Sequence, residues 1–119
     1  MPNFVITNVY STPMTDDKYD GVAVVSEDPC KLLKLIVENG SSSIRWLQVH
    51  DGYEAPTAGD VPVVSIKLAA STQTTLSLED VGGLPLSIGC VLTVSSTGPA
   101  YTAVTASSSE GAFINAFWI

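Results

Sequence analysis

His50 and Asp51 are the residues whose types most readily suggest chemistry, because an imidazole beside a carboxylate forms part of hydrolytic triads. Serines at positions 41–43 would supply the nucleophile a short distance before them. Adjacent residues of a strand point to opposite faces, however, so Asp51 is poorly placed to orient His50. The serine run also lacks the sharp, glycine-flanked turn of a nucleophile elbow. We therefore expect no enzyme, and we expect His50 to be a strand-end residue that contacts solvent or a neighbour.

Cys30 and Cys90 are the two cysteines, and their separation of sixty residues matches no zinc-binding motif. Together with the single histidine they cannot complete a typical zinc site unless carboxylates join them. We expect both thiols to be reduced and to lie in or near the core, because disulfides are uncommon in a reducing compartment. The sequence alone leaves a disulfide between them open.

Acidic residues gather early in the chain, at Asp16, Asp17, Asp20 and Glu27–Asp28. Their spacing does not match the ligand pattern of a calcium-binding loop. They are interpreted as a solvated loop, with a weak divalent-ion site as the alternative. Gly82-Gly83 is interpreted as a turn and not a phosphate loop, since no Lys-Ser/Thr pair and no helix follow it. The sequence thus predicts neither a metal nor an organic cofactor.

Four aromatic side chains could line a sugar-binding platform, because sugars stack on such rings. They are Trp46, Tyr53, Tyr101 and Trp118. Scattered aromatic residues in a small β-domain belong more often to the core or to an interface, and this is the reading we favour.

The charge balance bears on the partners of the chain. Twelve acidic and five basic residues give a net charge of −7, whereas binding to nucleic-acid phosphates needs Lys and Arg. No apolar run reaches the roughly 18 residues of a membrane helix. The N-terminus lacks the basic region and long apolar core of a secretory signal. We expect a soluble protein made in a cytosol, with no nucleic-acid or membrane partner.

Charged residues are scarce, at 14% of the chain against a usual share of roughly 25%. Much of the surface must therefore consist of Ser, Thr, Gly and apolar atoms. Such a surface suits burial against other subunits, although a Ser/Thr-rich β-domain would have a similar composition.

Strands must position all of these residues, and the stretch from Lys31 to Leu68 organises them. Its apolar runs, 31–39, 44–50 and 61–68, are separated by Asn39-Gly40 and by Asp51-Gly52. Asn-Gly between apolar runs is a strong hairpin signal, because both residues tolerate positive φ. We therefore predict an antiparallel meander, with residues 31–37 of the first run in a strand buried on both faces. In the second run, Leu47 and Val49 should face away from Trp46 and Gln48.

Further short strands are predicted before and after this stretch, at 4–10, 22–25, 75–78, 86–95, 101–106 and 113–119, with Pro13 ending the first of them. In the run 86–95, Ile88, Cys90, Leu92 and Val94 should share one face, and Gly89 marks a bulge or a close backbone approach. About eight short strands at regular spacing indicate an all-β fold, an antiparallel β-sandwich that is jelly-roll-like. The chain reads as a single domain, in which residues 1–29 form an N-terminal arm or the first strands and residues 30–119 form the sandwich.

The last seven residues, FINAFWI, are apolar on both strand faces. Phe113, Phe117 and Ile119 should share one face, with Ile114 and Trp118 on the other. A free edge of this composition would aggregate. Either the strand lies centrally in its sheet, or another subunit covers its second face.

The order of features from about Lys31 to Ile119, roughly three quarters of the chain, resembles a family of small virion proteins of tailed bacteriophages. The matching stretches are IRWLQVHD at 44–51, the segment 55–63 with Ala55-Pro56 and Gly59-Asp60-Val61-Pro62-Val63, and LSIGCVLTVSST at 86–97. In those proteins a strand that ends in an acidic or Asn turn precedes a Pro-Gly loop, a Pro-Val strand and a late strand with Ser-Ser-Thr. This chain has Ser87-Ile88-Gly89 where the family carries Phe-x-x-Gly, and residues 1–30 match nothing in it.

The resemblance implies a non-enzymatic virion structural protein, most closely a capsid decoration, or cement, protein. Such proteins are small, acidic, β-rich and commonly trimeric, and they stabilise the head by clamping neighbouring capsid subunits. The implied partners are sister copies, in a homotrimer, and the major capsid protein. The implied location is the capsid surface after synthesis in the host cytoplasm, with the N-terminal arm reaching to the capsid or to a sister subunit.

The alternative function is a receptor- or glycan-binding module of a tail fibre or spike, suggested by Trp46, Tyr53 and Tyr101 in or near loops. The candidate interface residues are Phe4, Trp46, Tyr53, Phe113, Phe117, Trp118 and Ile119.

Overall fold

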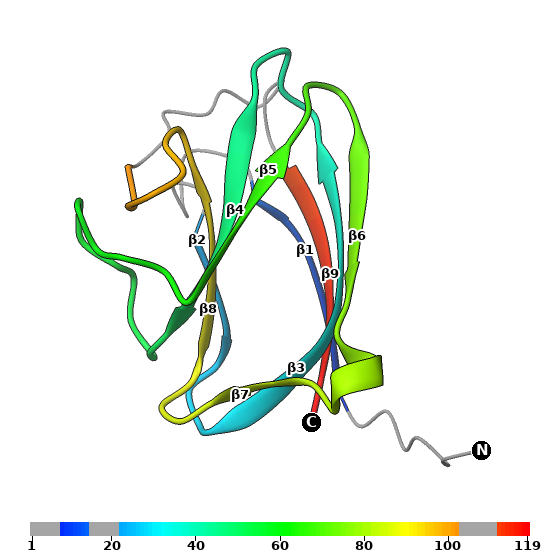
Figure 1. The fold of residues 1–119 in the computed structure, drawn as a ribbon, viewed down its shortest axis with the longest axis vertical. Helices are drawn as coiled ribbons and strands as arrows, with labels where there is room; N and C mark the ends of the chain where they lie inside the picture. Colours follow the sequence, from blue (N-terminus) through cyan, green and yellow to red (C-terminus); the bar gives the residue numbers. More distant parts are fainter. Residues whose placement is uncertain (1–7, 15–21, 103–111) are drawn as a thin grey trace.

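A computed structural model of the chain describes residues 8–14, 22–102 and 112–119. These residues form two antiparallel sheets that face each other (Figure 1). The first, sheet A, has the strand order β1 (Asn8–Met14), β9 (Ala112–Trp118), β3 (Cys30–Asn39) and β6 (Gln73–Ser77), and β7 (Leu84–Leu86) also pairs with β3. The second, sheet B, has the order β2 (Val22–Ser26), β8 (Cys90–Ser95), β4 (Arg45–Asp51) and β5 (Val64–Leu68). A single 3₁₀ turn, η1 (Glu79–Val81), lies between β6 and β7 in the described part of the chain.

The strand pairs are nested along the chain. Strand β1 pairs with β9, β2 with β8, β3 with β6, and β4 with β5. The antiparallel β-sandwich predicted from the sequence is confirmed. The jelly roll stays a prediction, which this nested pairing supports because a jelly roll is built from two Greek keys wound into two sheets.

The core lies between the sheets and is built by alternate residues of each strand. Its members that are fully shielded from solvent include Leu32, Leu35, Leu47, Val49, Leu68, Leu92 and Ile114. Val64 and Ile66 of β5 and Leu76 of β6 pack against this cluster from its margin. Leu47 and Val49 face inward and Trp46 and Gln48 face outward, as their spacing predicts.

The predicted hairpin at Asn39-Gly40 is wrong, because β3 and β4 lie in different sheets. The side chain of Asn39 explains the difference, because its hydrogen bonds stabilise a crossover between the sheets and not a tight turn. Its amide donates to the carbonyls of Ser43 (3.1 Å) and Ala69 (3.1 Å), and its oxygen accepts from Ser41 N–H (3.0 Å). Asn39 thereby ties the β3–β4 crossover to the β5–β6 crossover. The pairing predicted between the next two runs, β4 and β5, is confirmed.

The predicted continuous strand over 86–95 is divided in two. Strand β7 ends at Leu86 and β8 begins at Cys90, so Ile88 lies in the turn and is 47% exposed instead of facing the core. The close approach predicted at Gly89 is confirmed. A Cβ at this position would lie 2.4 Å from the carbonyl oxygen of Gly52 and 2.5 Å from that of Ser26.

Strand β3 is not buried on both faces, contrary to the prediction for residues 31–37. Leu35 and Val37 face the core, whereas Lys31 and Glu38 are exposed on the outer side. Leu33 is buried outside the core, because Gly83, which follows η1, lies against it.

The first and last predicted strands also differ in detail from the structure. Pro13 lies within β1 and does not end it, which an edge strand tolerates. Residues 22–25 are strand as predicted, and the predicted strand 75–78 is observed as β6, over Gln73–Ser77. Tyr101 and Thr102 are not in a strand, and the rest of the predicted strand 101–106 lies outside the described residues.

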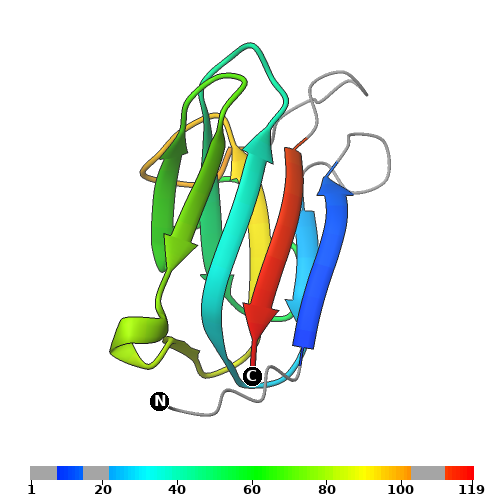
Figure 2. The same cartoon turned by 90° about the vertical axis from the view of Figure 1, so that its right-hand side faces the viewer.

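Strand β9 lies inside sheet A, between β1 and β3, as Figure 2 shows. Of the two arrangements considered for the C-terminal strand, the structure shows the one inside the sheet. Ile114 and Ala116 are fully buried and Trp118 packs against the core, whereas Phe113 and Ile119 are each 45% exposed on the opposite face. Cys30 and Cys90 are both free thiols inside the core, as expected.

Candidate functional site

A cleft of about 550 Å³ opens where β4 ends and the loop 52–63 begins. This volume lies within the range of about 300–1,000 Å³ that is typical of small-ligand sites. Most of its lining comes from one continuous stretch of chain. The lining residues are His50–Thr57, Asp60, Val61, Val63 and Ile88.

His50 is one of the residues that line the cleft. It lies at the end of β4 as predicted, but its side chain is only 8% exposed, so of the predicted contacts the one with solvent is wrong. The ring meets Tyr101 edge-on, with centroids 6.0 Å apart and planes at 89°. Burial lowers the pKa of His50 below its usual 6.5, although the Asp60 carboxylate acts in the opposite direction. The imidazole is therefore neutral at pH 7, and its Nε2 has no hydrogen-bond partner among the described residues.

The segment 96–102 buries the outer face of sheet B and so shields His50. The Gln48 amide donates to the carbonyls of Thr97 and Gly98, both at 3.0 Å. Ser95 Oγ accepts from the backbone N–H of Thr102 at 2.9 Å. The residues beneath this segment, Gln48, Thr93 and Ser95, are consequently fully buried although they point away from the main core.

The loop 52–63 is fastened to the same segment. Tyr101 N–H donates to the carbonyl of Asp60 at 2.8 Å, and Gly59 N–H donates to the carbonyl of Tyr101 at 2.9 Å. The Asp60 carboxylate accepts from Thr57 N–H at 2.9 Å, which closes a turn that includes Gly59 at φ +94°. These contacts hold the far wall of the cleft, including the Asp60 side chain, in a defined position relative to His50.

Asp51 has a structural role that removes it from any chemistry with His50. Its carboxylate accepts hydrogen bonds from the backbone of Ile88 (2.8 Å), Ser87 (3.0 Å) and Gly89 (3.2 Å) and from the Ser87 hydroxyl (2.9 Å). Partial desolvation raises the pKa of Asp51, but these hydrogen bonds outweigh it and hold the pKa below 3.8. The carboxylate fixes the turn between β7 and β8, which forms one side of the cleft.

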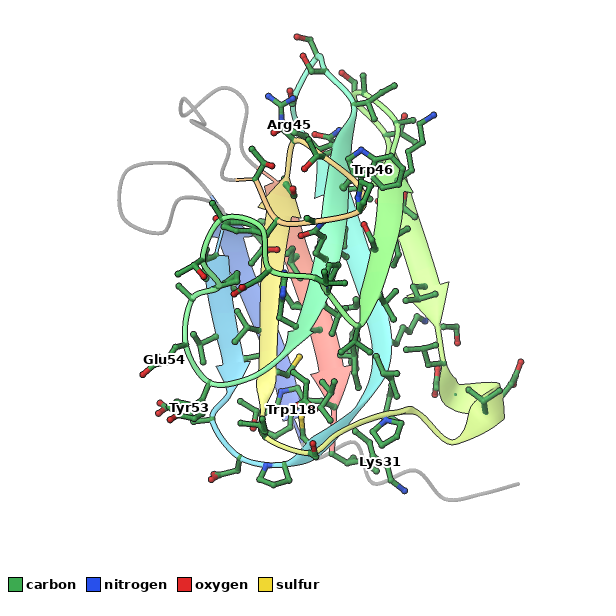
Figure 3. All side chains as sticks on the ribbon, turned by 60° about the vertical axis from the view of Figure 1, so that its left-hand side comes forward. Lys31, Arg45, Trp46, Tyr53, Glu54 and Trp118 are labelled. Atoms are coloured by element: carbon green, nitrogen blue, oxygen red, sulfur yellow. The ribbon has the colours of Figure 1, made fainter. Side chains whose placement is uncertain are left out.

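The outer rim of the cleft combines an aromatic ring, aliphatic groups and carboxylates. Tyr53 is 54% exposed and projects next to Glu54 from the outer part of the loop (Figure 3). Val61 and Val63 are 77% and 52% exposed. Three carboxylates line the cleft, from Asp51, Glu54 and Asp60, and no Lys or Arg is among the lining residues. The cleft therefore carries negative charge at neutral pH and disfavours anionic ligands.

The four aromatic residues considered for a sugar platform are not brought together. Trp46 lies at the start of β4, with its indole against Gly98, and Trp118 packs against the core. Figure 3 shows these two rings toward opposite ends of the sandwich, with Tyr53 on the outer loop. Tyr101 is buried beneath the loops, so Tyr53 alone of the four lines the cleft.

The candidate interface residues are divided between two faces. Phe113, Phe117 and Ile119 lie on the outer face of sheet A, whereas Trp46 and Tyr53 belong to sheet B and its loops. Trp118 points inward, and Phe4 lies outside the described residues. The sequence did not single out Asp60, whose position depends on a contact with a segment forty residues away. The Asp-Gly signal at Asp51 marked a turn but not the four hydrogen bonds that the carboxylate accepts.

Within the ranges 8–14, 22–102 and 112–119, no three His, Cys, Asp or Glu residues are arranged to bind a metal ion. The same ranges contain no helix with the length and apolar character needed to cross a membrane. Comparison with family models, with curated proteins and with solved structures finds no match to this chain.

Proposed function

We propose that this protein is a non-enzymatic structural protein of a tailed-phage virion, a capsid decoration protein that stabilises the head by binding neighbouring capsid subunits. The observation that carries the proposal is the outer face of strand β9. This face, called here the β9 face, presents Phe113, Phe117 and Ile119, with Ile36 of β3 beside Asn115. The other sheet has loops across its outer side, whereas Phe113 on the β9 face is 45% exposed.

The β9 face is suited to protein contact by its composition as well as its exposure. Lys34 is paired with Phe117 and Glu38 with Phe113, so one positive and one negative group flank the aromatic rings. An apolar centre with a few polar groups at its margin is the usual anatomy of a protein interface. The same surface contains a small groove of about 170 Å³, which is lined by Leu33, Lys34, Glu79 and Phe117.

Decoration of a capsid fits this arrangement because symmetry repeats a modest contact many times. Each β9 face is small, but copies bound to a symmetric shell, or joined in the trimer that the family resemblance implies, act together and gain avidity. The proposed partners are therefore sister copies and the major capsid protein. The low share of charged residues, 14%, supports the same role.

The first test is the oligomeric state of the purified protein, measured by light scattering across a range of concentrations. We expect a homo-oligomer, with a trimer favoured. The double substitution Phe113→Ser and Phe117→Ser should shift the protein toward monomer, because it removes the apolar centre of the β9 face. The control is Val61→Ser, which removes an apolar side chain that is more exposed than Phe113, 77% against 45%, from the loop on sheet B and should leave the mass unchanged.

The second test is the protein composition of purified virions from the phage that encodes the chain. The protein should be present in many copies and should be released, with loss of head stability, when the double substitution is introduced. A monomer at every concentration that is also absent from virions would refute the proposal.

A further inference from the structure

We propose that the β9 face binds the β9 face of a second copy of this chain, in a two-fold contact with the strands of the two copies antiparallel. The inference rests on the proposed assembly role and specifies which of the two proposed partners covers this face. The observation that carries it is the order of charges along β3, which makes the face complementary to itself. Figure 2 looks onto this side of sheet A, with β3 and β9 side by side.

The register of β3 with β9 places one charge of each sign beside the two aromatic rings. Lys34 is paired with Phe117 and Glu38 with Phe113. Ile36 lies midway between the two charges along β3. Because the residues between these three face the core, Lys34, Ile36 and Glu38 share the outer side of the strand. The β9 face is therefore positive at one end and negative at the other, with apolar groups between.

A two-fold axis in the contact plane, perpendicular to the strands and passing through Ile36, reverses this order. It brings Lys34 of each copy opposite the partner's Glu38, so two ion pairs form at symmetric positions. It also brings Phe117 of each copy opposite the partner's Phe113, and Ile36 opposite itself. Stacked sheets lie about 10 Å apart, a gap that a lysine and a glutamate side chain can span together.

The neighbouring strand β6 brings no like charges together in this arrangement. Its residues paired with Lys34 and Glu38 are Ser77 and Gln73, which are exposed and uncharged. The same axis places Ser77 of each copy opposite the partner's Gln73. A two-fold axis that runs along β3 would instead stack Lys34 on Lys34 and Glu38 on Glu38, which is unfavourable. Charge therefore selects the antiparallel arrangement.

The size of the face predicts a weak contact. Four strands of about seven residues, spaced about 4.8 Å apart, cover roughly 450 Å² of flat area, so two copies bury on the order of 1,000 Å². Stable specific interfaces bury about 1,200–2,000 Å², and we therefore expect a Kd on the order of 10–100 μM. A two-fold contact closes on two copies, so the assembly is a dimer, or a hexamer where a trimer also forms through another surface.

The experiment is sedimentation velocity of the full chain in low salt, from about 1 μM to about 1 mM, for the wild type and two charge reversals. Lys34→Glu and Glu38→Lys each place like charges together at both symmetric positions. Each should weaken self-association about tenfold. An equimolar mixture of the two variants should associate at least as tightly as the wild type, because both ion pairs between unlike copies are again attractive. Recovery in the mixture also shows that both variants are folded.

Lys67→Glu and Glu54→Lys are the matched controls, because they make the same changes of net charge at exposed positions of sheet B and its loop. Neither control should change self-association, and their mixture should associate no more tightly than the wild type. A gain in this control mixture as large as the recovery in the first mixture would assign the effect to net charge and overturn the two-fold contact.

Failure of this inference is distinguishable from failure of the assembly role. A wild type that is monomeric at every concentration, or single variants that associate like the wild type, would overturn the pairing of β9 faces in favour of another partner for this face, such as the capsid protein. Weakened association in both variants without recovery in their mixture would overturn the antiparallel geometry. In each case the protein's presence in purified virions would still support the assembly role, whereas a monomer absent from virions would overturn both.

Discussion

Asn39 should be the most sensitive polar residue of the framework, because its side chain joins two crossovers that connect the sheets. It is 1% exposed, at the end of β3. Its amide also donates to the Leu68 carbonyl at 3.4 Å, in addition to the carbonyls of Ser43 and Ala69. Asn39→Ala removes the donor group and the acceptor for Ser41 N–H, and no neighbouring side chain is described that could replace them.

The size of the effect follows from these contacts. Two amide protons and one carbonyl oxygen make about three net hydrogen bonds, each worth roughly 1 kcal/mol, which gives a loss of about 3 kcal/mol in the free energy of unfolding. This is a large part of a typical total of about 5–15 kcal/mol. Asn39→Asp keeps the shape and the bond from Ser41 N–H, but it places a carboxylate against three carbonyl oxygens. Its destabilisation at pH 7 should be at least as large, and it should shrink as the pH falls toward ~4, because the buried carboxyl is protonated in the folded state before it is protonated in the unfolded state.

The measurement is equilibrium unfolding in urea, followed by tryptophan fluorescence from Trp46 and Trp118 and by circular dichroism. With a slope of about 1–3 kcal/mol/M, the Asn39→Ala midpoint should fall by roughly 1–3 M. Ser42→Ala is the control, because Ser42 is exposed in the same crossover and its loss should change stability by no more than about 0.5 kcal/mol. If Asn39→Ala is as stable as Ser42→Ala, the crossovers do not depend on this side chain and the reasoning is refuted.

Three further predictions concern the turns, the histidine and the thiols. Gly89→Ala should destabilise the fold by about 1–3 kcal/mol, since its Cβ would meet two backbone carbonyls, while Gly52→Ala, with nothing within 4 Å of its Cβ, should be nearly neutral in the same urea assay. The Hε1 NMR signal of His50, the only histidine, should titrate with a midpoint below pH 6.5, and a midpoint at or above 6.5 would contradict the burial argument. The free energy of unfolding should decline as the pH falls from about 6.5 toward the lowered pKa of the folded state, because the unfolded state binds the proton first. Burial raises the pKa of Cys90 to about 12 and also raises the pKa of Cys30. Neither thiol should therefore react with Ellman's reagent until the protein is unfolded. Rapid labelling of the native protein would contradict the buried positions of the two thiols.

The sequence predicted the sandwich because alternation is a local property of each strand. Val64, Ile66 and Leu68 share the inner side of β5, and the two faces of FINAFWI are divided in β9 as their spacing requires. It did not predict which sheet each strand joins. Asn39-Gly40 has the composition of a hairpin, but the chain crosses between layers there because the Asn39 amide finds acceptors thirty residues ahead.

The site was less predictable than the fold, since it depends on contacts between loops. Gln48, Thr93 and Ser95 have the polar character of a solvent-facing side, yet the segment 96–102 buries them. The same covering turns His50 from an apparent surface residue into a buried one beside Tyr101. No local pattern in the sequence indicates that a Gly-Pro turn folds back across a sheet, so this second layer could be found only from the structure.

The pairing of β1 with β9 has a consequence for how the protein is made. Strand β9 lies between β1 and β3, so sheet A is incomplete until β9 has left the ribosome. Until then β1 lacks its hydrogen-bonding neighbour, and the edge of β3 that β9 will occupy is open. Sheet A should therefore form late in synthesis and slowly, because the pairing of β1 with β9 joins segments about a hundred residues apart.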